Sequence, residues 1–350
     1  MAVGLGTTML LLAFAVSSPL SGAAAKKKPK PPAVVTLNVV MPTTGADDLN
    51  FVATNNGFFK RNYLKVNISL ATSTTLASEI ASGQAQIGVN SIAVPLQIAE
   101  QGIPTSVIYA LTGGGQGGSL MGPPGATVTS IQAAAKPGCA IGSLSEGTSA
   151  YGAALIYIQK LSLPCTVIQY STTAAEVGAL AGGSIIAIAG AYNNFVSALA
   201  ANQVVAVVNT ENAAQSQQYL GTPHPEVVLF GLTATLNDLR PAVVRYLKAI
   251  SEAAKWLSQV TPTRAATQIQ SEPVLAGITV PEEAVSVTAL NDYRWKGSEK
   301  GYITSKEWGS SMNDVALWGV LNFKSGATYT KYGVSANMSY YVAALGKPKS

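Results

Sequence analysis

The stretch ASEIASGQAQIGVNSIAVPLQIAEQGIPTSVIYAL (residues 77–111) is repeated in outline by VGALAGGSIIAIAGAYNNFVSALAANQVVAVVNT (residues 177–210). Each has the end of a helix, a Gly pair or Ser-Gly, a short apolar strand, a small polar corner, a second helix and a second apolar strand. The offset is constant, since Gly83 corresponds to Gly183. A repeat of this kind predicts two similar α/β lobes, and the alternative is chance likeness between two strand–helix–strand units.

The residues before the repeat extend the same pattern. Residues 34–42 form a nearly continuous apolar run, as expected of a strand that is buried on both faces. Residues 64–70 and 86–90 predict two further strands, and residues 73–81 predict a helix between them. Alternation of strands and helices favours a parallel sheet.

Composition and charge limit the kind of protein. The chain has 350 residues, of which 48% are hydrophobic and 11% charged, so it can bury a large core in two compact lobes. The formal net charge is +5, but residues 26–30 hold four of the 22 basic side chains, which leaves 18 against 17 acidic ones from Pro31 onward. We therefore expect no nucleic-acid partner, and we expect a monomer.

The first 33 residues predict export. Residues 9–16 are an apolar run too short to span a bilayer, and three alanines at 23–25 suit a signal-peptidase site. We interpret residues 1–25 as a signal peptide and residues 26–33 as a solvated, basic, Pro-rich arm. No Lys or Arg precedes the apolar run, which leaves the true start codon open, and no Cys near the cleavage point supports a lipid anchor. The expected location is periplasmic or otherwise extracytoplasmic.

Five segments carry a resemblance to a known family. They are NNGFFKRNYLKVNISL (55–70), ASGQAQIGVNS (81–91), AEQGIPTSVIYA (99–110), CAIGSLSEGTSAYGAAL (139–155) and SIIAIAGAYNNFVSAL (184–199). Together they resemble the extracytoplasmic solute-binding proteins of the nitrate, sulfonate, taurine and thiamine-precursor ABC importers (the NMT1/THI5-like family). The resemblance covers most of residues 34–210, and beyond residue 231 it rests only on helical pattern.

This resemblance implies a type II periplasmic-binding-protein fold, in which two α/β lobes hold a ligand in the cleft between them. Residues 34–112 would form part of the first lobe, residues 113–210 the second lobe, and residues 211–350 would return to the first lobe with C-terminal helices. Within that return, Asn237 is predicted to cap a helix that extends to Val260. The implied function is the substrate-binding component of an ABC importer, which captures a small organic solute, delivers it to a membrane permease and needs no cofactor.

Candidate ligand-binding residues lie where the predicted strands end. In open α/β sheets, ligands bind beyond the carboxyl ends of the strands. Small hydroxyl and amide side chains there can donate and accept hydrogen bonds without filling the cleft. The corners of this sequence supply Thr43, Thr44, Asp47, Asn90, Ser91, Thr112, Ser145, Glu146, Thr148, Ser149, Tyr192 and Asn193. For residues 145–149 an ordinary helix cap is an equal alternative, and for Tyr192 the alternative is packing within the second lobe.

The charges near these corners indicate the ligand class. Between Val66 and Leu239 the basic residues are Lys136 and Lys160, and neither lies at a predicted corner. An anion would therefore lack an Arg clamp. Asp47 and Glu146 supply acceptors, although either can instead begin a helix. We expect a solute with amino or N–H donors rather than a simple inorganic anion.

Solute import has two alternatives. An enzyme on the same two-lobe fold, similar to the thiamine-pyrimidine synthases, would need the Cys-rich motif of those enzymes, which this sequence does not contain. His224 is the sole histidine and lies between two prolines, and no nucleophile, phosphate-loop or metal-ligand motif occurs, so we expect no enzymatic activity. A solute receptor for a sensor partner is the third possibility.

The two cysteines, Cys139 and Cys165, each open a predicted strand, with a helical segment between them. In a right-handed strand–helix–strand unit these strands are parallel and adjacent, so both residues lie at the same end of the sheet. An exported location is oxidising, which favours a disulfide. Two buried thiols on opposite faces of the sheet are the alternative.

Overall fold

The first of two β-sheets is built mainly from the N-terminal third of the chain. The computed structural model describes residues 1, 31–42, 48–113, 118–210, 212–221, 225–272, 279–281, 283–284, 287–288, 301–317 and 335–348. The strands of this sheet are β1 (Val35–Met41), β2 (Leu64–Leu70), β3 (Ile87–Ser91), β4 (Thr105–Gly113), β10 (Pro225–Leu232) and β11 (Ser335–Ala336), in the spatial order β11-β4-β10-β3-β1-β2. β10 runs antiparallel to both of its neighbours, whereas β1, β2 and β3 are parallel.

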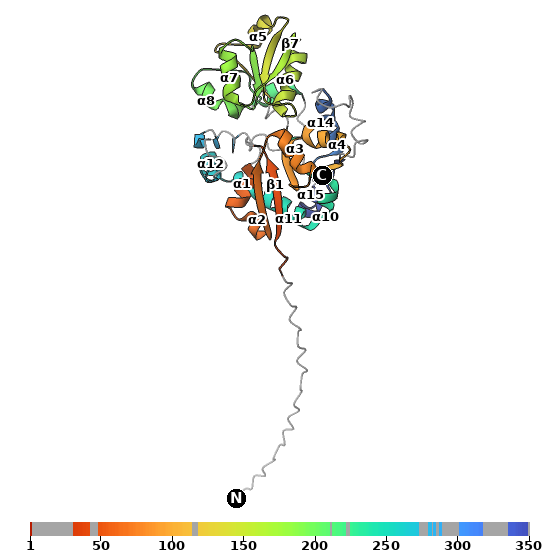
Figure 1. Ribbon diagram of the computed structural model, residues 1–350. Helices are drawn as coiled ribbons and strands as arrows, with labels where there is room; N and C mark the ends of the chain where they lie inside the picture. Colours follow the sequence, from red (N-terminus) through yellow and green to blue (C-terminus); the bar gives the residue numbers. More distant parts are fainter. Residues whose placement is uncertain are drawn as a thin grey trace. The chain divides into compact units, whose positions relative to one another are not determined.

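The second sheet, drawn in yellow and green in Figure 1, has the same strand order as the first. Its strands are β5 (Ser119–Gly122), β6 (Cys139–Ser143), β7 (Cys165–Gln169), β8 (Ala187–Gly190) and β9 (Val205–Val208). The order β7-β6-β8-β5-β9 matches β2-β1-β3-β10-β4, with β5 as the antiparallel strand in the place of β10. The prediction of two α/β lobes is confirmed, and we call the elements around the first sheet the first lobe and those around the second sheet the second lobe.

The repeat holds at the level of single residues. The helix α3 (Ser73–Ala81) is matched by α7 (Thr173–Ala181) at an offset of 100. Both helices begin after a threonine whose hydroxyl accepts a hydrogen bond from the backbone N–H three positions on. Both are followed by a glycine with positive φ, +78° at Gly83 and +70° at Gly183, a conformation that glycine adopts without strain.

Helices cover the sheets and close the cores. The first lobe contains α1 (Asp48–Asn55), α2 (Phe58–Arg61), α3, α4 (Ala93–Glu100), α10 (Thr233–Asp238), α11 (Arg240–Leu257), α12 (Pro262–Ile269), α14 (Ser305–Leu317) and α15 (Ser339–Leu345). The second contains α5 (Val128–Ala134), α6 (Ser149–Lys160), α7, the 3-10 helix η1 (Tyr192–Phe195), α8 (Val196–Ala200) and α9 (Ala213–Leu220). Ile156 of α6 is part of the first lobe's apolar cluster, so the two cores are continuous there.

The predicted C-terminal helix differs from the observed one at its start. Asn237 does not cap it, because Asn237 lies inside the short helix α10 and α11 begins at Arg240 with Leu239 as its N-cap. The Asn237 side chain instead accepts a hydrogen bond from the Tyr340 hydroxyl of α15, at 2.7 Å. Pro241 occupies the first turn of α11, where a missing N–H costs nothing. The predicted signal peptide and most of the basic arm lie outside the described residues.

The second lobe contains a disulfide between Cys139 and Cys165. The two residues lie directly opposite each other at the amino ends of the parallel strands β6 and β7, with Cα atoms 4.5 Å apart. This geometry places the bridge at the end of the sheet opposite to the strand ends that carry the polar corners. The bridge therefore constrains the second lobe without occupying its carboxyl edge.

A glutamate is buried in the same lobe. Glu176 lies in the first turns of α7 and is 1% exposed, and its Oε1 atom has no hydrogen-bond partner among the residues that the structure describes. Burial raises the pKa of the Glu176 carboxyl from 4.5 to about 8. The carboxyl is therefore protonated in the folded protein at neutral pH.

Replacement of both cysteines by serine should lower the free energy of unfolding by about 3 kcal/mol, because the bridge closes a loop of 26 residues in the unfolded chain. Urea unfolding measures the difference. Intact-mass measurement of unreduced, denatured protein after alkylation should find no reactive thiol, and two alkylated cysteines would refute the bridge.

Glu176→Gln should change how stability depends on pH. Because the folded state keeps a proton that the unfolded state releases between about pH 4.5 and about pH 8, the wild-type free energy of unfolding falls as pH rises through this window. Glutamine stays neutral, so the variant's free energy of unfolding should exceed that of the wild type by on the order of 5 kcal/mol at about pH 9 and nearly equal it at about pH 4. Equal differences at both pH values, measured by urea unfolding, would contradict this.

Candidate functional site

The candidate site is the set of polar corners at the carboxyl edges of the two sheets. Thr43, Thr44 and Asp47 lie outside the described residues. The other predicted residues are described, and each is placed below.

Asn90 and Ser91 end β3 but are largely committed to the protein's own hydrogen bonds. The Asn90 Nδ2 atom donates to the Ser73 hydroxyl at 3.3 Å, and its Oδ1 atom accepts from the Ser91 backbone N–H at 2.7 Å. The Ser91 hydroxyl accepts from the Ala93 backbone N–H at 3.4 Å. Both side chains are buried, so they shape the corner and join β3 to the start of α3.

Thr112 and Ser143 differ from Asn90 and Ser91 in their hydrogen bonding. Each is fully buried near the carboxyl end of its strand, β4 or β6, and neither side-chain oxygen has a hydrogen-bond partner among the described residues. Buried hydroxyls are usually satisfied, so unpaired ones need an explanation. Thr112 and Ser91 both pair with Val227 of β10 from opposite sides, which places them in one row of the sheet roughly 10 Å apart.

Ser143 was not predicted from the sequence. It ends β6, two positions before the predicted corner that begins at Ser145, and the run Gly142-Ser143 has the small polar character of the other corners. Its burial and its unpaired hydroxyl, which mark it as a candidate, are features of the tertiary structure.

The corner at residues 145–149 is both a helix cap and a fixed loop. Thr148 is the N-cap of α6, because its hydroxyl accepts from the Tyr151 N–H at 3.2 Å while it donates to the Ser145 carbonyl at 2.8 Å. The Glu146 backbone N–H donates to Gln169 Oε1 at 3.0 Å, and Ser149 is the first residue of the helix. Glu146 is exposed, and burial followed by the nearby Glu146 charge raises the pKa of Tyr151.

Tyr192 and Asn193 follow β8 in the 3-10 helix η1. Tyr192 is partly buried and packs against the apolar cluster under α7 and α8, as in the alternative interpretation of this residue. Asn193 is 9% exposed. The position of both residues directly after β8 keeps them at the carboxyl edge of the second sheet.

A pocket of about 700 Å³ lies between the first lobe and the 145–149 corner. Its walls are formed by α3, by α4 and by Glu146, and they carry hydroxyls (Ser73, Thr74, Ser78, Ser82), carboxamides (Gln97, Gln101) and the carboxyls of Glu100 and Glu146. No Lys or Arg is among these lining residues. Asn90, Ser91, Thr112 and Tyr192 do not line this pocket, although Ser73 connects it to Asn90.

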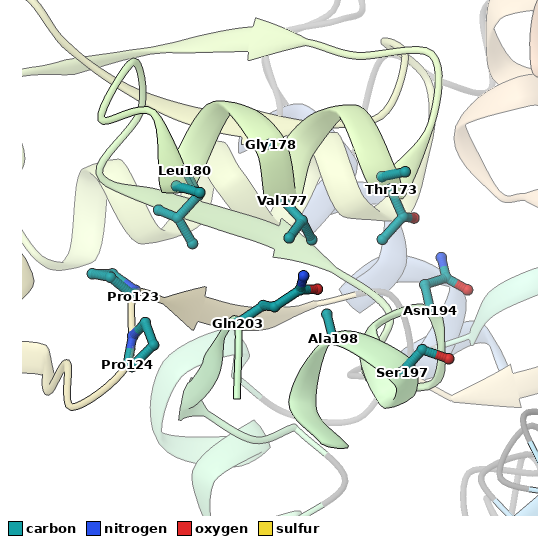
Figure 2. Close-up of a pocket in the computed structure, with 12 residues that line it drawn as sticks. Pro123, Pro124, Thr173, Val177, Gly178, Leu180, Asn194, Ser197, Ala198 and Gln203 are labelled. Atoms are coloured by element: carbon teal, nitrogen blue, oxygen red, sulfur yellow. The ribbon is translucent and has the colours of Figure 1, made fainter. Parts of the chain in front are cut away.

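A second pocket, of about 690 Å³, lies in the second lobe between α7, α8 and the turn at Pro123 and Pro124 (Figure 2). Val177 and Leu180 give it an apolar wall, and none of the predicted site residues lines it. Within the described part of the chain, no group of three or more His, Cys, Asp and Glu side chains is arranged to hold a metal ion. None of the described helices combines the length and apolar character needed to cross a membrane.

Solved structures with the same fold come from several organisms. The alkanesulfonate-binding protein of Xanthomonas axonopodis pv. citri, bound to MOPS, is 13% identical, with a TM-score of 0.65 over 87% of this chain and 100% of its own. The periplasmic nitrate-binding protein of Synechocystis PCC 6803 is 12% identical, with a TM-score of 0.67 over 89% and 88%. The ligand-binding component of an ABC-type import system from Staphylococcus aureus, with zinc bound, is 11% identical, with a TM-score of 0.68 over 89% and 99%.

These likenesses show the periplasmic-binding-protein fold. A comparison with curated protein sequences found no match. The family model described as NMT1/THI5 like matches residues 49–264, which is more than half of the 350 residues. The chain therefore belongs to the NMT1/THI5-like family.

Proposed function

We propose that the protein is the substrate-binding component of an ABC importer, which captures a small organic solute between its lobes and delivers it to a membrane permease. The observation that carries this proposal is the pair of buried, unpaired hydroxyls of Thr112 and Ser143, one at the carboxyl edge of each sheet. A solute held between the two edges would give both hydroxyls a hydrogen-bond partner. Family membership and the named import-system structures support the same role.

The side chains near the two edges favour a solute with amino or N–H donors. The pocket beside the 145–149 corner combines hydroxyl and carboxamide groups with two carboxyls and no basic side chain. Carboxylates accept hydrogen bonds, whereas an anionic solute is commonly held by Arg. The ligand of this chain would then differ from the nitrate and alkanesulfonate after which two of the compared proteins are named.

We also propose that the protein works outside the cytoplasm. A solute-binding component works outside the cytoplasm, which agrees with the N-terminal segment that the sequence suggests is a signal peptide and with the periplasmic nitrate-binding protein of the same fold. We propose that the protein acts as a monomer, without nucleic acid, and leaves the solute chemically unchanged.

A thermal-shift screen of small organic compounds should find at least one that stabilises the protein. Binding to the folded state alone stabilises by RT ln(1 + [L]/Kd), about 2.7 kcal/mol when the compound is present at about 100 times its Kd. Amines and N–H heterocycles should be over-represented among the hits. A hit that is recovered in a chemically altered form after incubation would instead indicate an enzyme.

Thr112→Val should separate ligand binding from stability. The hydroxyl has no hydrogen-bond partner in the described part of the chain, so its loss should leave the free energy of unfolding unchanged or slightly higher, while solute affinity falls by about tenfold. Thr105→Val is the matched control on the same strand, since the Thr105 hydroxyl donates to the Pro95 carbonyl at 2.8 Å and is also fully buried.

The control should lose about 1 kcal/mol of stability and keep its affinity. Calorimetric titration with the compound found in the screen, together with urea unfolding, gives both quantities. Unchanged affinity in Thr112→Val and in Ser143→Ala would remove the main support for the proposed site.

A further inference from the structure

A glutamine of the first lobe contacts a glycine of the second, separately from the contact of Ile156 with the first lobe's apolar cluster. A Cβ atom built on Gly147, in the second lobe's corner, would lie 3.1 Å from Oε1 and 3.2 Å from Nε2 of Gln97 in α4 of the first lobe. The Gln97 carboxamide therefore lies next to Gly147, on the side where any other residue would carry its Cβ atom. Gly147 has a φ of +87°, so the position favours glycine on conformation as well as on space.

Both partners are held firmly by their own lobes. On the second-lobe side, Glu146 is tied to Gln169 and Thr148 caps α6, which fixes the backbone on either side of Gly147. On the first-lobe side, α4 is buried along most of its length, and its Pro95 carbonyl accepts a hydrogen bond from Thr105 of β4. A contact between two such fixed points determines how closely the corner approaches the first lobe.

The internal repeat shows that the groove containing Gln97 does not itself require a long side chain. The pockets of the two lobes are equivalent at the offset of 100, since Ser73, Ala77 and Gln97 line one and Thr173, Val177 and Ser197 line the other. Ser197 and Val177 are labelled in Figure 2. The second lobe forms its groove with the short Ser197 in place of Gln97, so the packing of the two helices does not explain the glutamine.

We propose that Gln97 is a positioning residue: its carboxamide, resting on Gly147, sets the distance between the first lobe and the 145–149 corner. This inference rests on the proposed function, since that distance matters for a solute held between the lobes. Gln97 also lines the pocket that Glu146 borders, so the contact fixes one wall of the space that a solute can enter.

A double-mutant cycle on the purified full chain tests the contact. Gln97→Ala removes the carboxamide, and Gly147→Ala adds a methyl group 3.1 Å from Gln97 Oε1, which forces the carboxamide to shift. Gly138→Ala is the matched control, because Gly138 has the same φ of +87° but nothing within 4 Å of an added Cβ. The readouts, taken without added ligand, are amide hydrogen exchange at residues 145–148 and the radius of gyration from small-angle X-ray scattering.

Gln97→Ala and Gly147→Ala should each speed exchange in the corner by about tenfold and increase the radius of gyration, and the double variant should be no worse than either. Gln97→Met, which keeps the side-chain length, should restore wild-type exchange. Gly138→Ala should leave amide exchange at residues 145–148 unchanged, and its effect on the protein should be independent of the effect of Gln97→Ala. The proposal would be overturned if Gln97→Ala kept the wild-type exchange rate and radius of gyration. It would also be overturned if the exchange rate of the double variant rose by the product of the two single effects. Because no ligand is added, failure to find a stabilising solute would count against the proposed function and not against this contact.

Discussion

The structure depends on one constraint of parallel β-sheets: each parallel strand must be reached through a crossover helix. The carboxyl ends of the parallel strands therefore meet at one edge of each sheet. In the first lobe, α3 lies between β2 and β3, and in the second lobe α7 lies between β7 and β8. The small polar corners of the sequence follow these strands, so the same constraint that builds the sheets also gathers hydroxyl and amide groups at their edges.

The two lobes repeat one arrangement of strands and helices. Equal strand orders give both lobes an edge of the same kind, and equal offsets give both a groove between successive helices. The two grooves differ in chemistry. The first lobe's groove is lined with hydroxyls, carboxamides and carboxyls, whereas the second lobe's groove has an apolar wall. The chemical difference between the two grooves, rather than the repeat itself, is what would give the protein selectivity for a solute.

Sequence patterns predicted the fold well because the signals are local. Thr72 and Thr172 begin matching helices, and Gly83 and Gly183 end them, so a reader of the sequence can find both lobes without a structure. Helix boundaries were less predictable, as Asn237 shows: this good capping residue lies inside a short helix, and its side chain accepts a hydrogen bond from Tyr340, about a hundred residues away.

The candidate site was harder to predict, because the role of a polar side chain depends on its partners. Asn90 and Ser91 look like ligand contacts in the sequence, yet the folded chain uses them in its own hydrogen bonds. Thr112 was predicted, but Ser143 was not, although both are buried with unpaired hydroxyls. The burial of Glu176 and the contact of Gln97 with Gly147 arise from elements that are distant in the chain or that pack through tertiary contacts, and no local pattern indicates them.

Native mass spectrometry of the protein, freshly purified from its own host, can detect a solute that stays bound. We expect a fraction with the mass of the polypeptide plus one small organic molecule, which is released unchanged on denaturation, and we expect that Thr112→Val prepared in the same way carries less of it. If the purified protein carries no small molecule, and if it forms no such complex with any of the screened solutes, the proposal that it binds a solute is contradicted.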